Sequence, residues 1–266
     1  MYIRIKRNRR ARLLFLLLFM LAFFYAWHLP QNNLPLRESY LEDKTVKGKE
    51  RKEVSSRIGE QIVFDVMLGK VRIGTARYHY VREAKVDGRE AYLITFETKA
   101  VKFRDQETIY CDRATFLPVL VERKVTQLLK PENIREVYDQ RNYTLTITKK
   151  RFTEETQVIK KDGPIHNSIL LPFFVRNNSD LKAGWSVEVN LPQKNFKITL
   201  TAVEDVDVPA GIFQAYYFES EPSQIKIWIS TDERRIPLKL EGTGGIGYRL
   251  VMREYIAPNK NAADGK

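Results

Sequence analysis

The sequence predicts a mainly β protein, in which a large curved antiparallel sheet or open barrel of about twelve strands follows a single N-terminal transmembrane helix. Three observations lead to this prediction. Residues 13–27 contain no charge and are almost wholly apolar. From residue 58 onward, apolar and polar residues alternate with a period of two in many short runs, as in strands that bury one face. The chain is also rich in aromatic residues, with 13 Tyr and 14 Phe, which favour strands.

The first element is an uncleaved signal anchor over residues 13–29. A helix from residue 11 to residue 29 would be about 28 Å long, close to the thickness of a bilayer core. Residues 1–12 carry six basic residues and no acid, so we expect them to stay in the cytoplasm. The rest of the chain would then be periplasmic, and the protein a single-pass protein of the inner membrane.

Two alternative signals compete with the anchor. A cleaved secretory signal needs small residues at its end, whereas residues 23–28 are mostly bulky, although cleavage stays open as an alternative. A lipoprotein signal needs a cysteine directly after the apolar run, and the single cysteine is Cys111. With one cysteine there is no internal disulfide, and we expect Cys111 to be buried as a small apolar residue.

Residues 30–57 are predicted to be a charged linker, because large apolar residues are sparse there and cannot offset the entropy of the chain. Residues 258–266 form a polar tail. The net charge of +12 is a weak sign of a nucleic-acid partner, because half of the excess lies in the first twelve residues, where it sets topology. We therefore expect no nucleic-acid partner.

The β domain is predicted to span residues 58–257, with turn signals between its strands. Residues 165–178 break the alternation: the apolar run Ile169–Val175 predicts a short helix or a plug that crosses the sheet. Pro172 would have to lie in the first turn of this helix or interrupt it. The clearest one-sided strands lie at residues 61–68, 92–99, 143–148, 185–191, 196–201, 225–229 and 246–253.

The sequence contains few residues in patterns typical of catalytic or metal sites. The three histidines have no metal-ligand spacing, and neither a nucleophile elbow nor a phosphate-binding loop is present, so we predict no metal, no cofactor and no catalytic residue. The glycine-rich residues 242–247 are predicted to be a turn between strands. Glu204, Asp205 and Asp207 form the densest acidic group, which we expect in a solvated loop.

Several motifs resemble an uncharacterised bacterial envelope family catalogued as domain of unknown function 3108. They are Gly59-Glu60 with the strand that follows and Ile73-Gly74-Thr75-Ala76, then Ser168 to Arg176, Val208 to Phe213, and Ile227 to Pro237. The resemblance covers roughly residues 58–256. It implies a periplasmic, largely β protein and brings no assigned activity. The general plan is similar to that of lipoprotein carriers of the LolA/LolB type, an analogy that does not establish function.

These patterns lead to two hypotheses. The first is a non-enzymatic envelope protein that binds a lipid, a lipoprotein acyl chain or an envelope partner, with Tyr92, Ile94 and Phe96 facing an apolar ligand. The second is an enzyme acting on envelope polysaccharide through two carboxyl groups that the fold brings together. Asp232, Arg234 and Arg235 are expected to form a charged connection between strands, or alternatively a polar recognition spot.

Overall fold

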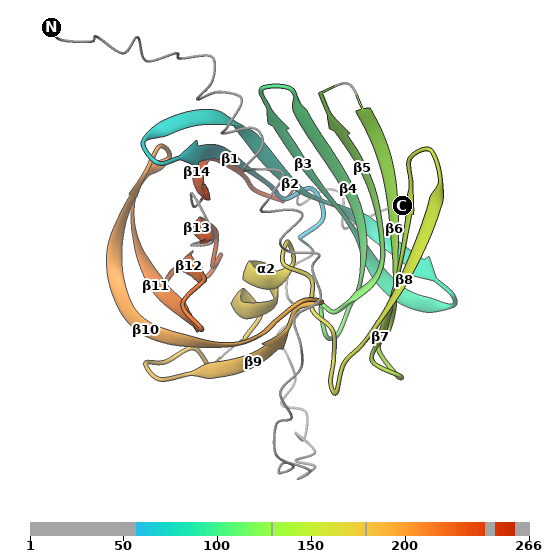
Figure 1. Ribbon diagram of the computed structural model, residues 1–266. Helices are drawn as coiled ribbons and strands as arrows, with labels where there is room; N and C mark the ends of the chain where they lie inside the picture. Colours follow the sequence, from blue (N-terminus) through green and yellow to red (C-terminus); the bar gives the residue numbers. More distant parts are fainter. Residues whose placement is uncertain (1–56, 129, 179, 243–247, 259–266) are drawn as a thin grey trace, which may run out of the picture.

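The protein is a single antiparallel β-sheet that curls around one short helix, as seen in the computed structural model, which describes residues 57–128, 130–178, 180–242 and 248–258 (Figure 1). The predicted anchor at residues 13–29 and most of the linker lie outside the described residues. Within the described part of the chain, no helix has the length and apolar character needed to cross a bilayer.

The sheet has fourteen strands where the sequence predicted about twelve. The count was low because strands such as β6 (Lys130–Asp139) and β8 (Glu154–Lys160) are rich in charge, which hides their alternation. The other strands are β1 (Gln61–Leu68), β2 (Val71–Val86), β3 (Arg89–Ala100), β4 (Phe103–Asp112), β5 (Pro118–Gln127), β7 (Thr144–Lys150), β9 (Ser186–Asn190), β10 (Asn195–Val208), β11 (Gly211–Glu221), β12 (Ile225–Ser230), β13 (Pro237–Gly242) and β14 (Tyr248–Ile256).

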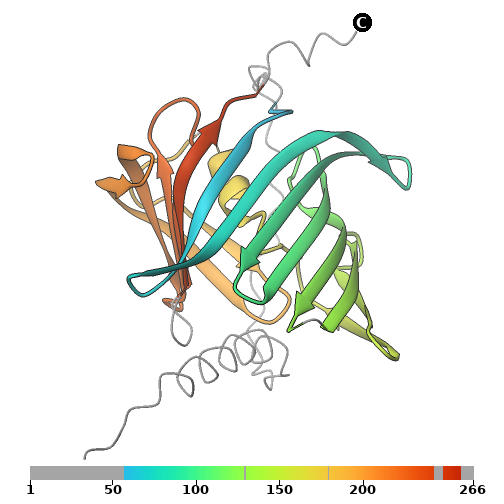
Figure 2. The same cartoon turned by 90° about the horizontal axis from the view of Figure 1, so that it is seen from above.

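The chain enters this sheet in the middle. The strand order is β8-β7-β6-β5-β4-β3-β2-β1-β14-β13-β12-β11-β10-β9, so the first and last strands lie side by side (Figure 2). From β1 the chain meanders outward to one edge at β8, crosses to the other edge at β9, and meanders back to β14. Every strand pair is antiparallel, as the one-sided alternation predicted.

The sheet does not close, because β8 and β9 do not pair with each other. The segment between them forms one isolated bridge, from Ile165 to Asn190 of β9. The side-chain amide of Gln140 takes the place of a neighbouring strand: its Nε2 donates to the Ile165 carbonyl at 2.8 Å, and its Oε1 accepts the Ile165 N–H at 2.9 Å. The crossing segment is therefore fixed to both halves of the sheet.

The crossing segment contains the helix α2 (Leu171–Arg176), which fills the space inside the curl (Figure 1). The predicted plug is thus a short helix, and Pro172 lies in its first turn, where a missing N–H is harmless. Phe173 packs with the main core, to which β1–β7 and β10–β14 contribute, whereas Leu171 and Val175 pack with a smaller core of β9–β12. We call the face of the sheet that packs against α2 the inner face.

The acidic group at residues 204–207 was predicted to be a loop, and this prediction was wrong. Glu204, Asp205 and Asp207 lie in β10 and pair with residues of β11. The acids alternate with Val206 and Val208, which are buried in the core, so this end of β10 is a one-sided strand that also pairs with β11. The turn at the tip of the β10–β11 hairpin contains Gly211, whose φ of +131° favours glycine.

Candidate functional site

A buried ion pair joins the start of the sheet to the end of the helix. Glu60 immediately precedes β1, and Arg176 is the last residue of α2. Arg176 Nη1 donates to Glu60 Oε1 at 3.2 Å, and Nη2 donates to the second carboxylate oxygen. Both side chains are 0 % exposed. Burying such a pair costs desolvation free energy, so its retention depends on the geometry of both hydrogen bonds.

Two further groups converge on the same carboxylate. The Tyr255 hydroxyl of β14 donates to Glu60 Oε1 at 3.2 Å, and Arg57 Nη1 lies 3.7 Å from that oxygen. Burial opposes the charge of Arg176, but the charge of Glu60 raises its pKa overall. Burial and then the positive charge of Arg176 lower the pKa of Arg57. One carboxylate therefore faces two guanidinium groups, and the cluster carries more positive than negative charge.

Three buried polar atoms of this neighbourhood have no hydrogen-bond partner among the described residues: Nε of Arg57, Nε of Arg176 and the hydroxyl of Tyr78. The Tyr78 ring stacks on Phe173 of α2, with ring centroids 3.5 Å apart. Burial raises the pKa of Tyr78 well above its usual value, so its hydroxyl stays protonated. All three atoms are donors, and we call Arg57, Glu60, Tyr78, Arg176 and Tyr255 the donor cluster.

The turn between β12 and β13 fixes the end of α2. Arg235 Nη1 donates to the main-chain carbonyl of Arg176 at 3.4 Å and also to the carbonyl of Asn178. Asp232 accepts from the Arg234 side chain and from the Arg235 N–H, so the turn itself is rigidly bonded. Cations near the last carbonyls of a helix are favourable because those carbonyls lack helical partners.

A second polar group interrupts the apolar inner face on β4–β6. Arg123 Nε lies 2.8 Å from Asp105 Oδ1 and 3.5 Å from Glu107 Oε1, so two carboxyl groups meet one guanidinium. The Tyr138 hydroxyl donates to Glu136 Oε2 at 2.6 Å on the next strand. Burial raises the pKa of Glu107 to about 8, which keeps this carboxyl protonated at neutral pH.

Most of the chain matches one protein family. The family described as "Protein of unknown function (DUF3108)" matches residues 63–253, which is most of the chain. The chain belongs to the DUF3108 family. The resemblance seen in the sequence is confirmed, and the family brings no activity with it. No curated protein matches the chain.

Solved structures with a similar course of the chain share 10 % sequence identity with it. One is a β-barrel-like protein of the domain of unknown function DUF1849 from Brucella abortus, with a TM-score of 0.48, covering 76 % of this chain and 98 % of that one. Another is a Bacteroides fragilis protein with a YmcC-like fold, with a TM-score of 0.31, covering 75 % of this chain and 96 % of that one.

The DUF3108 motifs that lie far apart in the sequence meet at the donor cluster. Glu60 comes from the opening motif, Arg176 ends the central motif, and Arg235 belongs to the last motif. Gly74 of the opening motif also has a packing reason, because a Cβ at this position would lie 2.1 Å from the Lys99 carbonyl oxygen. These motifs hold the plug helix inside the curled sheet.

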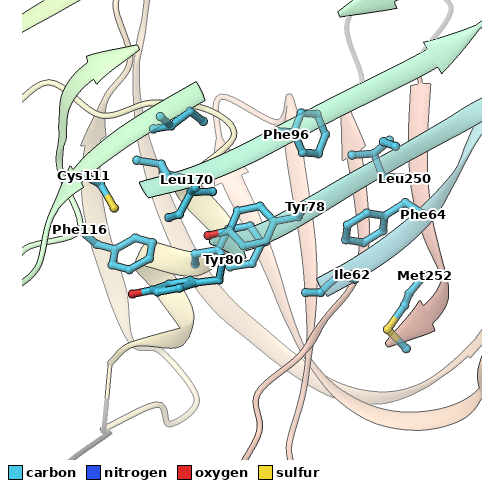
Figure 3. Close-up of a cluster of buried hydrophobic side chains, with 14 of the residues drawn as sticks. Ile62, Phe64, Tyr78, Tyr80, Phe96, Cys111, Phe116, Leu170, Leu250 and Met252 are labelled. Carbon is cyan, nitrogen blue, oxygen red and sulfur yellow. The ribbon is translucent and has the colours of Figure 1, made fainter. Parts of the chain in front are cut away.

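The residues predicted to face a ligand do share the inner face. Ile94 and Phe96 are buried in the main core, at 0 % and 8 % exposure, while Tyr92 is only partly buried. Tyr92 lies beside Tyr80, with ring centroids 4.8 Å apart, and beside Phe116. Figure 3 shows Tyr80 and Phe116 in the same buried cluster as Phe96 and Cys111. Cys111 is buried on the same face, as predicted, and burial raises the pKa of its thiol.

Neither the donor cluster nor the buried acids Asp105 and Glu107 of β4 were predicted from the sequence. The two acids could have been found from the alternation in β4: Asp105 and Glu107 are in phase with Ile109 and Cys111, which places both acids on the apolar face. The ion pair left no such signal, since its partners are 116 residues apart. Among the described residues, no group of three His, Cys, Asp or Glu side chains has the geometry of a metal site.

Proposed function

We propose that this DUF3108 protein is anchored in the inner membrane and that its periplasmic β domain binds an apolar ligand, namely a lipid or a lipoprotein acyl chain. The charge-free residues 13–29, preceded by six basic residues, support the anchor and its orientation. The domain after the anchor would then meet its ligand close to the bilayer surface.

The observation that carries this proposal is the aromatic wall of the inner face. Tyr80 of β2, Tyr92 of β3 and Phe116 of the β4–β5 turn place their rings within 6.3 Å of one another, centroid to centroid. Tyr92 is partly exposed, so the wall continues from the packed core to a surface that a ligand can reach. Rigid aromatic rings of this kind bury a large apolar area against an acyl chain at little entropic cost.

The donor cluster supports a ligand with an acidic head group. Tyr78 and Tyr80 are two residues apart on the same face of β2, so the cluster borders the aromatic wall. A carboxylate or phosphate of a lipid would accept the hydrogen bonds that Arg57 Nε and the Tyr78 hydroxyl do not make within the described chain. The two guanidinium groups of the donor cluster outnumber its single carboxylate, and this excess of positive charge favours an anion beside them.

The test is lipid extraction and mass spectrometry of the full-length protein purified from its membrane. We expect an acidic lipid enriched over the bulk membrane composition, and loss of that lipid in a Tyr92→Glu variant, because a charge in the aromatic wall disfavours an acyl chain. Tyr110→Glu is the matched control: Tyr110 is a partly buried tyrosine of β4 that pairs with Leu93, on the other face of the sheet. No enriched lipid in the wild-type protein would rule out the ligand-carrier function.

A second candidate function is an enzyme acting on envelope polysaccharide, and the buried acids Asp105 and Glu107 of β4 favour it. Asp105 and Glu107 both lie within 3.5 Å of Arg123 Nε, and the pKa of Glu107, raised by burial to about 8, suits a general acid. Incubation of the protein with cell-wall glycan fragments, with new reducing ends as the readout, tests this candidate. Activity lost in Glu107→Gln and kept in Glu122→Gln, an exposed acid of β5, would support it; an inactive wild-type protein would refute it.

A further inference from the structure

Strand β8 is the open edge of the sheet. It pairs with β7 only, and within the described chain no strand lies on its other side. Most of β8 is exposed, including Val158 at 63 %. Such an edge presents a row of unpaired backbone groups, which is a template for another strand. The opposite edge, β9, is partly covered by the bridge to Ile165.

The direction of the backbone groups in β8 follows from one hydrogen bond. The N–H of Lys161 donates to the carbonyl of Tyr143 at 2.9 Å, in continuation of the β7–β8 ladder. Successive residues of a strand point their N–H and C=O groups to opposite sides. The groups of Gln157 and the other odd-numbered residues therefore point to β7, and those of Glu154, Thr156, Val158 and Lys160 point to the open edge.

The sequence of β8 is complementary to itself when one copy is reversed. Glu154 and Glu155 lie at its start, and Lys160 and Lys161 lie at and just after its end. An antiparallel copy centred on Gln157 would set Glu154 opposite Lys160 and Thr156 opposite Val158. The pairing with β7 already uses the same charge pattern, since Lys150 lies opposite Glu154. Opposite charges directly across a strand pair stabilise it.

We propose that two copies of this chain associate through β8, antiparallel about a two-fold axis at Gln157, so that the sheet continues from one copy into the other. The register places all four outward-facing residues in hydrogen-bonded pairs, each of which exchanges two hydrogen bonds. The two-fold symmetry makes the interface self-complementary, as closed dimers require. A second copy fits better than an unrelated strand, because the acids and bases of β8 match in this register.

A symmetric disulfide tests the register. In the proposed dimer the two Gln157 residues form a non-hydrogen-bonded pair with Cα atoms about 4.5 Å apart, within the range for a disulfide. Gln157→Cys in the full-length protein, oxidised in its own membrane, should give a covalent species of twice the chain mass on a non-reducing gel. Gln157 is exposed, so the substitution leaves the core intact.

Lys160→Cys is the matched control, because Lys160 is exposed on the same strand, and its counterpart in the second copy would be about 20 Å away. Native Cys111 is buried in both variants. Absence of the Gln157→Cys dimer, equal crosslinking by Lys160→Cys, or a crosslinked species containing a different protein would each overturn the proposal.

Charge reversal gives an independent readout. Lys160→Glu, made in the Gln157→Cys protein, should weaken association by roughly tenfold, because two opposite-charge pairs become like-charge pairs. Adding Glu154→Lys should restore the crosslink, since the pairs are then reversed and complementary. Lys160→Glu without effect, or no restoration by the second substitution, would contradict the register.

Discussion

Replacement of Arg176 by methionine should destabilise the domain far more than loss of an ordinary surface ion pair. The substitution removes both hydrogen bonds to Glu60 and leaves that carboxylate 0 % exposed at the end of the plug helix. Breaking a buried pair from one side costs about 3–5 kcal/mol. Tyr255 and Arg57 still contact the carboxylate, so we expect a value near the lower limit, about 3 kcal/mol.

The free energy of unfolding is measured in urea, with tryptophan fluorescence as the probe, since Trp185 and Trp228 lie in the described domain. A loss of about 3 kcal/mol should lower Tm by roughly 6–12 °C for a domain of this size. Arg104→Met is the control: Arg104 is 53 % exposed and pairs with Glu97 at 2.7 Å, so its loss should cost less than about 1 kcal/mol.

Glu60→Gln completes a double-mutant cycle with Arg176→Met. The single Glu60 variant leaves the buried guanidinium of Arg176 beside that of Arg57 without their carboxylate. The double variant removes both charges of the Glu60–Arg176 pair. The double variant should therefore lose less free energy than the sum of the single variants. An Arg176→Met protein within about 1 kcal/mol of the wild type would refute the reasoning that this pair stabilises the plug.

Four further predictions follow from individual contacts. Arg235→Ala removes the donor to the last carbonyls of α2 and should cost about 1.5–3 kcal/mol by thermal unfolding, whereas an unchanged Tm would show that the turn does not hold the helix. Tyr78→Phe should leave the free energy of unfolding equal or higher, because the hydroxyl is buried and unpartnered within the described chain; a loss above about 1 kcal/mol would argue against this. Burial raises the pKa of Glu107 to about 8, so its stabilising contribution is complete below about pH 4.5 and is lost as pH rises through about 8; Glu107→Gln should become more stable relative to the wild type over that interval in Tm measurements, and a constant difference would contradict it. Burial lowers the pKa of His166 to about 4, so neutral His166 contributes its full share of folding stability above about pH 6.5, and this share is lost as pH falls through about 4. An NMR titration of His166 with a midpoint near 6.5 would contradict this.

The pattern of apolar and polar residues is enough to predict which side chains share a face of each strand. Period-two alternation identified the antiparallel sheet and placed Tyr92, Ile94 and Phe96 on one face, because successive side chains of a strand point to opposite sides. The break in alternation at residues 165–178 predicted a short helix or a plug, and the structure has a helix there with proline in its first turn. These features depend on neighbours in the chain, so they can be read without knowing the fold.

Contacts between residues far apart in the chain could not be predicted from local patterns, because they depend on how the sheet folds. Arg176 and Glu60, 116 residues apart, form a pair because the plug helix ends where the sheet begins. Asp65 and Arg253, 188 residues apart, form a pair because the last strand returns to the side of the first. Alternation shows which residues of a strand share a face. The register of strand pairing and the curl of the sheet determine which residues of other elements they contact.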